Sequence, residues 1–187
     1  NPGEERFVKQ FPAAQTGAVN ILSIELAGHG IYFARAGRLY CLKPGGVVQP
    51  VAVPLRQGLI QDLYTTPDGR LWVGATNGLF CVDSAQQVTE VAALRETSVN
   101  SMVKQGGRWL VCTNKGLFLL NTQTRQAEGP VYVQLDGKSQ PVDYVRRSFS
   151  ASNGITWFTS NTRKIYTSDA LKERFRHAPI DLMEPMK

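Results

Sequence analysis

The chain has 187 residues, of which 42% are hydrophobic and 19% are charged. This is the composition of an ordinary globular protein with one substantial core, and it excludes the disordered and fibrous classes. The formal net charge is +6, but lysine and arginine are scattered along the chain and form no basic run, so the sequence argues against a nucleic-acid-binding module.

The first predicted element is an edge strand in residues 5–12, where apolar and polar residues alternate up to Pro12. Four units of four short strands follow, at residues 19–52, 59–93, 98–135 and 141–180. Turns containing Gly, Pro or Asn separate the strands, as hairpins require. We expect the fourth strand of the third unit near residues 131–133, and the first strand of the fourth unit at residues 142–145.

The units repeat with a nearly constant period. Their third strands begin at Leu39, Leu79, Leu117 and Ile165, which are 40, 38 and 48 residues apart. A period near 40 with four strands per repeat is typical of a β-propeller, in which each unit forms one blade. We therefore predict an all-β fold of about four propeller blades, each made of four antiparallel strands.

The second strands support this prediction over a sandwich. Trp72 lies on one face of its strand while Leu71 and Val73 lie on the other, so both faces require cover, which neighbouring blades provide. A column of small residues, at the end of each second strand, predicts a position where backbones crowd together. Its members are Ala34, Gly74, Cys112 and Ser160.

One internal similarity bears on the extent of the propeller. The tripeptide Glu-Arg-Phe occurs at residues 5–7 and again at residues 173–175, each time followed by a proline. Residues 1–12 are therefore predicted to be the outer strand of a preceding blade, which makes the chain a fragment of a larger propeller. Alternatively, the same strand closes a small ring by pairing at the seam.

Residues 67–80, with the sequence Pro-Asp-Gly-Arg-Leu-Trp-Val-Gly-Ala-Thr-Asn-Gly-Leu-Phe, resemble the two-component regulator propeller repeat. The repeat reads approximately D-G-x-L-W-hydrophobic-G-T-x-x-G-L. The second unit matches closely and the other three loosely. Ala75 stands where the family has Thr, Cys112 replaces the Gly in the third unit, and Arg163-Lys164 replace the turn Gly in the fourth.

Proteins with such repeats are typically hybrid two-component sensors, in which extracytoplasmic propellers precede a membrane span, a kinase, a receiver and DNA-binding parts. The resemblance implies a periplasmic, ligand-sensing segment of an inner-membrane protein, with oligosaccharides as the ligands. It also implies that any kinase lies elsewhere, and that this segment contacts neither nucleic acid nor membrane itself.

The residues themselves show no catalytic set. A G-x-S-x-G nucleophile motif is missing, and the two histidines, His29 and His177, lie in unrelated positions. The three cysteines, Cys41, Cys81 and Cys112, have no zinc spacing and are expected to be buried free thiols. The aspartates lie at strand starts and turns, where they commonly bond their own backbone. We therefore expect no catalytic residue, no metal and no cofactor.

A ligand-binding face is predicted where the loops between blades meet the turns between second and third strands. Polar residues of these loops suit sugar hydroxyls or carboxylates, because Arg and Asn offer several hydrogen-bond donors. The candidates are Arg35, Arg56, Arg95, Asn100, Asn114 and Arg163, and the same loops carry Gln57, Lys115 and Asp143.

Two alternatives remain open from the sequence. The segment could be a protein-interaction or dimerisation scaffold that associates through exposed blade flanks. A lyase or hydrolase propeller is the other alternative, disfavoured because no base, nucleophile or metal set emerges from the residues.

Overall fold

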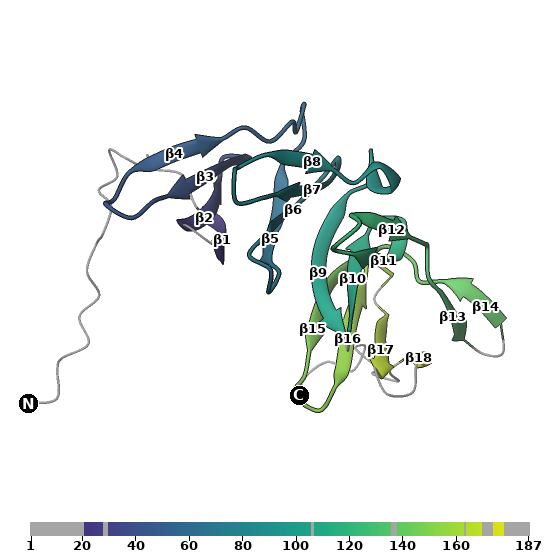
Figure 1. The fold of residues 1–187 in the computed structure, drawn as a ribbon. Coiled ribbons are helices and arrows are strands. Elements are labelled where there is room, and N and C mark those ends of the chain that lie inside the picture. Colours follow the sequence, from purple (N-terminus) through teal and green to yellow (C-terminus); the bar gives the residue numbers. More distant parts are fainter. Residues whose placement is uncertain are drawn as a thin grey trace, which may run out of the picture.

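The computed structural model describes residues 21–27, 30–105, 107–135, 138–162, 164–169 and 174–177. These residues form four antiparallel sheets of four strands and one separate two-stranded hairpin (Figure 1). The prediction of all-β propeller blades with four strands each is confirmed. The strand predicted at residues 1–12 lies outside the described residues.

Each sheet follows the chain from its first to its fourth strand. The first sheet contains β1 (Ile21–Ala27), β2 (Gly30–Arg35), β3 (Arg38–Leu42) and β4 (Val48–Val51). The second contains β5 (Ile60–Thr65), β6 (Leu71–Ala75), β7 (Gly78–Val82) and β8 (Val88–Glu90), followed by the short 3-10 helix η1 (Ala92–Leu94).

The third sheet contains β9 (Val99–Gln105), β10 (Arg108–Thr113), β11 (Gly116–Asn121) and β12 (Gln126–Glu128). A hairpin of β13 (Tyr132–Leu135) and β14 (Lys138–Pro141) comes next and projects from the body of the molecule (Figure 1). The fourth sheet contains β15 (Val145–Ser150), β16 (Ile155–Ser160), β17 (Ile165–Asp169) and β18 (Arg174–His177).

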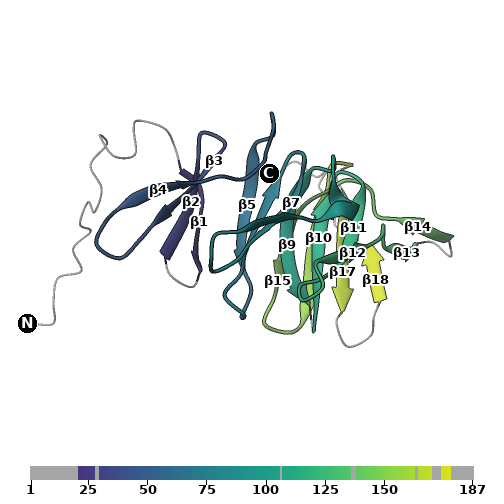
Figure 2. The same cartoon turned by 45° about the horizontal axis from the view of Figure 1, so that its top comes forward.

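The first strand of each sheet is its innermost strand. Strand β1 contacts β5, β5 contacts β9, and β9 contacts β15. The sheets fan out from this row of strands as blades do around a propeller axis, with the first and second blades side by side and the third and fourth beyond them (Figure 2).

Three apolar cores lie between successive blades, and they explain why the middle strands are hydrophobic on both faces. Every residue of β6 and β7 is buried. Trp72 faces the core shared with the third blade, while Leu71 and Val73 face the core shared with the first. The predicted two-sided cover of this strand is therefore confirmed.

Crowding at the end of the second strand is also confirmed at Gly74. A Cβ atom at this position would lie 3.0 Å from Cγ1 of Val99 and 3.2 Å from its carbonyl oxygen. The equivalent residues Ala34 and Cys112 are fully buried. The first strand of the next blade approaches so closely that only a small residue fits. In the fourth blade the prediction of Ser160 was wrong by one position, because Ser160 pairs with Val145 as Ala75 pairs with Ile60, and Thr159 stands where the second blade has Gly74.

The prediction for the fourth strand of the third blade was wrong. Residues 126–128 form that strand as β12, pairing with β11, whereas residues 132–135 pair with β14 instead. Asn121 Oδ1 accepts the N–H groups of Gln123 and Thr124, which closes a tight turn and brings the chain back early. Strand β12 has the sequence Gln-Ala-Glu, so only Ala127 packs on the core and no apolar pattern reveals the strand.

The predicted first strand of the fourth blade, at residues 142–145, was also wrong, because β15 begins at Val145. Val142 is fully buried, but it lies in the connection before the strand and packs on the core between the third and fourth blades. The Tyr144 carbonyl accepts the N–H of Asn161, as Leu59 and Ser98 do for the equivalent turns of their blades. Tyr144 is therefore the residue immediately before the innermost strand.

Candidate functional site

The loops between blades lie against the turns between second and third strands, as the predicted binding face requires. The Leu59 carbonyl accepts the N–H of Thr76 at 2.9 Å, and the Ser98 carbonyl accepts the N–H of Asn114 at 3.0 Å. Side chains add to these bonds, since Asn77 Nδ2 donates to the Leu55 carbonyl at 2.6 Å. The face is thus built from hydrogen-bonded loops at one end of the blades.

Three of the predicted ligand residues are arginines of this face. The guanidinium of Arg35 lies over the ring of Tyr40, 5.8 Å from its centroid. Arg56 lies 3.9 Å from Glu96, with both side chains largely exposed. Arg95 holds Glu90 through two hydrogen bonds of 3.0 and 2.8 Å. Each of these guanidinium groups therefore has a partner within the protein.

The two predicted asparagines bond to the backbone. Asn114 Oδ1 accepts the N–H of Ser98 at 2.9 Å, which fixes the loop between the second and third blades. Asn100 Nδ2 donates to the Val145 carbonyl at 2.8 Å and joins the third blade to the fourth. The sixth predicted residue, Arg163, lies outside the described residues. The role of all six in ligand binding stays a prediction.

A polar pocket of about 260 Å³ opens among the innermost strands of the second, third and fourth blades. We call it the axial pocket. It is lined by Gln61, Asn100, Tyr144, Arg146 and Arg147. Of the predicted ligand residues, Asn100 contributes to this lining.

A β-bulge in each innermost strand creates the axial pocket. In β5 the pairing passes from Ile60 to Asp62, so Gln61 is the extra, unpaired residue. Asn100 is skipped in the same way in β9, and Arg146 in β15. A bulge redirects the side chain of its extra residue, and here three repeat-equivalent bulges bring three polar residues to one pocket. The first blade has Leu22 at this position.

The charges around the pocket come from Arg146, Arg147 and Asp62. Arg147 Nη1 lies 3.2 Å from Asp62 Oδ2. This ion pair joins the fourth blade directly to the second, although the third blade lies between them in the chain. Asp62 also accepts the Leu63 N–H at 3.0 Å and the Tyr64 hydroxyl at 2.8 Å. Burial, and next the Asp62 charge, raise the pKa of the Tyr64 phenol above its ordinary value, so this hydroxyl remains a donor.

Sequence reasoning missed Arg146 and Arg147 because it began the fourth blade at Val142. One spacing contains the missing signal: each innermost strand precedes the tryptophan of the second strand by a similar number of residues. The intervals are 12 from Ile60 to Trp72, 10 from Val99 to Trp109 and 12 from Val145 to Trp157, against 15 from Val142 to Trp157. These intervals of 10 to 12 residues align Val145 with Ile60 and Val99, and therefore Arg146 with Gln61 and Asn100.

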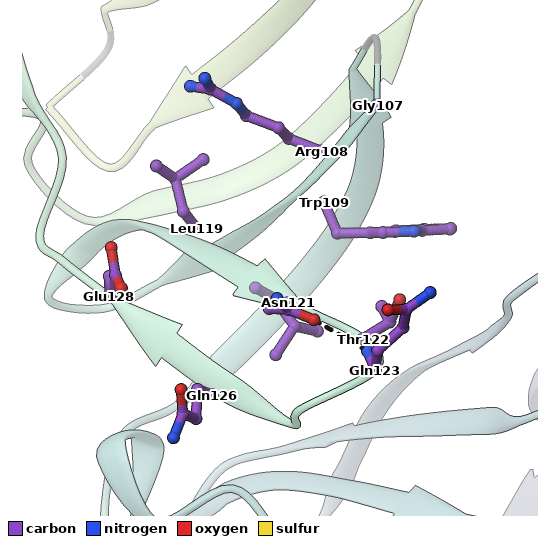
Figure 3. A pocket seen from close by; sticks show the side chains of 10 residues that line it. Gly107, Arg108, Trp109, Leu119, Asn121, Thr122, Gln123, Gln126 and Glu128 are labelled. Atoms are coloured by element: carbon purple, nitrogen blue, oxygen red, sulfur yellow. Dashed lines mark hydrogen bonds between the residues drawn. The ribbon is translucent and has the colours of Figure 1, made fainter.

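A larger hollow, of about 580 Å³, lies at the opposite end of the third blade (Figure 3). It is lined by the start of β10 and by the turn between β11 and β12, including Arg108, Trp109 and Glu128. Arg108 and Trp109 point in different directions from their strand (Figure 3). A single blade supplies this hollow, whereas three blades supply the axial pocket, so we take the axial pocket as the candidate site.

Two features of other classes of protein are missing from the described residues. No group of three or more His, Cys, Asp or Glu side chains there is placed to hold a metal ion. Within the same residues, no helix has the length and apolar character that a membrane crossing requires.

Comparison with known proteins supports the repeat and the fold. Residues 54–77 match the family model described as the two component regulator propeller. The sequence resemblance is therefore confirmed for the second blade. A search of curated proteins found no match.

Solved structures give the same fold at low identity. The extracellular domain of a putative one component system from B. thetaiotaomicron is 20% identical, with a TM-score of 0.67, over 84% of this chain and 23% of that one. The extracellular domain of a putative hybrid two component system from the same organism is 14% identical, with a TM-score of 0.65, over 91% of this chain and 26% of that one.

A virginiamycin B lyase from Staphylococcus aureus is also similar, at 14% identity and a TM-score of 0.63, over 87% of this chain and 56% of that one. The chain thus spans about a quarter of the two extracellular domains and just over half of the lyase. Likeness at these identities concerns the fold, so the protein is a β-propeller segment similar in fold to parts of these extracellular domains and of this lyase.

Proposed function

We propose that this chain is an extracytoplasmic, ligand-sensing propeller segment of a hybrid two-component signalling protein, and that it binds oligosaccharides without catalysis of its own. The repeat match at residues 54–77 and the likeness to extracellular sensor domains support the sensing role. The oligosaccharide ligand is an expectation from the repeat family.

The axial pocket is the observation that carries the proposal. Three blades each place a bulge residue there, and the residues are an amide in Gln61 and Asn100 and a guanidinium in Arg146. Such groups hydrogen-bond hydroxyl and carboxylate oxygens. A pocket shared by several blades also couples ligand binding to the relative position of the blades, which is what a sensor requires.

The pocket lining argues for binding rather than turnover. Its five residues include amides, guanidinium groups and a phenol, but no carboxylate, imidazole or thiol, and the neighbouring Asp62 carboxylate is paired with Arg147. Those missing groups are the usual general bases and nucleophiles. The likeness to virginiamycin B lyase, at 14% identity, does not transfer its activity.

Isothermal titration of the protein against neutral and acidic oligosaccharides tests this proposal. We expect saturable binding by at least one of them, and Gln61→Ala should weaken it because the variant removes a pocket amide. The exposed Gln87→Ala, in the turn between β7 and β8, serves as the matched control and should bind normally. If neither neutral nor acidic oligosaccharides bind, the oligosaccharide part of the proposal is wrong.

Periplasmic location, within an inner-membrane protein, is part of the same proposal. It rests on the likeness to extracellular domains. A protease added to cells with a permeabilised outer membrane should cleave this segment while a cytoplasmic marker stays intact. Protection equal to that of the marker would contradict the location.

A second candidate, self-association through a blade flank, is favoured by one observation. Three apolar side chains of the first blade are exposed on β1 and β2, namely Ile24 at 60%, Leu26 at 70% and Ile31 at 41%. Exposed apolar clusters commonly mark interaction surfaces. Sedimentation velocity of the protein and of Leu26→Glu tests this: an oligomer that the variant dissolves supports association, and a monomeric wild type excludes it.

A further inference from the structure

We propose that the axial pocket binds the carboxylate end of an anionic ligand, that Arg146 and Arg147 are its cationic partners, and that Asp62 is the internal carboxylate from which the ligand takes Arg147. This inference rests on the proposed ligand-sensing function and adds the chemical class of the ligand. The ligand is either an acidic oligosaccharide or a small carboxylic acid.

Positive charge exceeds negative charge at the pocket. Two arginines line it, and Asp62 pairs with one of them, Arg147. Arg146 has no hydrogen bond and no ion pair within the part of the chain that the structure describes. The Arg146 guanidinium is therefore left to receive an anion, and a guanidinium binds a carboxylate through two parallel hydrogen bonds.

The bulge brings both arginines to the same place. In a regular strand, neighbouring side chains point to opposite faces. Because the pairing of β15 passes from Val145 to Arg147, Arg146 is the extra residue and its direction changes, so that both arginines line one pocket. Two arginines that are adjacent in the sequence thus line the same pocket and can bind one anion together.

The existing ion pair can exchange its partner at low cost. The Arg147 side chain is 66% exposed, while that of Asp62 is 19% exposed. Asp62 keeps hydrogen bonds from the Leu63 N–H and the Tyr64 hydroxyl when Arg147 leaves. Arg147 is therefore the mobile member of the pair, and no buried carboxylate loses all of its donors when a ligand arrives.

The pocket dimensions and the other donors limit what enters. A volume of about 260 Å³ is below the range of roughly 300–1,000 Å³ that whole small ligands fill, so the pocket takes the end of a longer ligand or a small molecule. Gln61 has no hydrogen-bond partner among the described residues and supplies an amide to the ligand. Asn100 is held by Ser98 and Val145 and forms the fixed wall.

The test is isothermal titration of the protein with three probes: trigalacturonate, cellotriose as the neutral oligosaccharide, and succinate as the small dicarboxylate. The variants are Arg146→Gln, Asp62→Asn and, as the matched control, Arg108→Gln, which removes an exposed guanidinium at the opposite end of the third blade, outside the axial pocket. Thermal melts of each variant verify that it is folded.

We expect Arg146→Gln to weaken trigalacturonate or succinate binding at least tenfold and Arg108→Gln to leave it unchanged. Asp62→Asn should strengthen the same binding severalfold, because it releases Arg147 while its amide oxygen still accepts the Leu63 N–H. Acidic-probe binding that Arg146→Gln leaves intact, or that Asp62→Asn weakens, overturns the inference.

The three probes separate this inference from the proposed function. Binding of cellotriose, with no binding of either acidic probe, overturns the carboxylate site and leaves oligosaccharide sensing intact. Binding of succinate alone supports the carboxylate site and contradicts the oligosaccharide ligand. Failure of all three probes to bind the wild-type protein overturns both.

Discussion

The interface between the second and third blades differs from the interface between the third and fourth. The first is an apolar core in which Trp72, Leu79 and Leu94 pack against Val99 and Val111. Its hydrogen bonds, from Arg70 to the Thr122 carbonyl and from Arg125 to the Thr89 hydroxyl, lie away from the innermost strands. The second also has an apolar core, but hydrogen bonds from the innermost strand of the third blade accompany it. They join Ser101 to Ser148 at 2.9 Å, Asn100 to the Val145 carbonyl at 2.8 Å and Gln105 to the Ser168 carbonyl at 2.9 Å.

The two interfaces therefore contribute differently to stability and to ligand recognition. Buried apolar surface stabilises without direction, whereas hydrogen bonds fix the register of one blade against the next. The polar interface is also the one that supplies Asn100, Arg146 and Arg147 to the axial pocket. The apolar core therefore continues through both interfaces, and hydrogen bonds between innermost strands are added where the pocket forms.

Among the changes predicted for the two interfaces, replacement of Trp72 by Ala should reduce the free energy of unfolding most. The side chain is fully buried in the apolar interface, so the free energy of unfolding should fall by about 3–5 kcal/mol. Urea unfolding monitored by circular dichroism measures it. Trp109→Ala, on the third blade's side of the same apolar core, is the control and should cost less because that side chain is only partly buried. An equal loss of unfolding free energy in the two variants would contradict the expectation that the fully buried tryptophan stabilises the interface more.

Replacement of Gly74 by Ala should have the next largest effect. The new Cβ atom would meet the backbone and side chain of Val99 at 3.2 and 3.0 Å, and overpacking of this kind costs about 1–3 kcal/mol. Thermal unfolding compares it with Gly107→Ala, where a Cβ atom meets nothing within 4 Å. An unchanged melting temperature in Gly74→Ala would show that the blades can separate to admit the methyl group.

Loss of one hydrogen bond between the third and fourth blades should lower the free energy of unfolding less than either change above. Ser148→Ala removes one inter-blade hydrogen bond to Ser101, with an expected loss of about 1 kcal/mol. A double-mutant cycle with Ser101→Ala isolates the pair, and Ser84→Ala, at an exposed turn position, is the control. A coupling energy near zero would mean that this bond does not stabilise the interface.

The smallest effect at neutral pH belongs to Cys112, which lies in the core between the third and fourth blades. Burial raises the pKa of its thiol from 9.0 to about 11. The unfolded chain loses this proton first as the pH rises, so the thiol's contribution to stability is complete below pH 9.0 and is lost by about pH 11.

The measurement is the difference in unfolding free energy between the wild type and Cys112→Ala, at intervals across that pH range. The difference should shift in favour of the variant as the pH rises, since the variant has no thiol to ionise and other titrations cancel. A constant difference would show that the folded-state thiol ionises as readily as the unfolded one.

Sequence pattern alone predicted the repeat, the four-stranded blades and the crowded position at Gly74. Those features follow from local alternation and spacing, which are properties of neighbouring residues. It failed at β12, where the strand is polar, and at β15, where the apolar Val142 serves the core from a connecting segment. In both places a tertiary contact, and not local pattern, decides which residues form the strand.

The candidate site shows the same division. The chain encodes polar loop residues, and among them Asn100 was predicted and lies in the axial pocket. Only the tertiary structure revealed that Asn114 bonds the Ser98 backbone, that Arg95 pairs with Glu90, and that Arg146 joins Gln61 at the axis. The physical reason is that a bulge and the packing of successive blades set the direction of these side chains, and residues more than 80 positions apart, such as Asp62 and Arg147, become partners through folding alone.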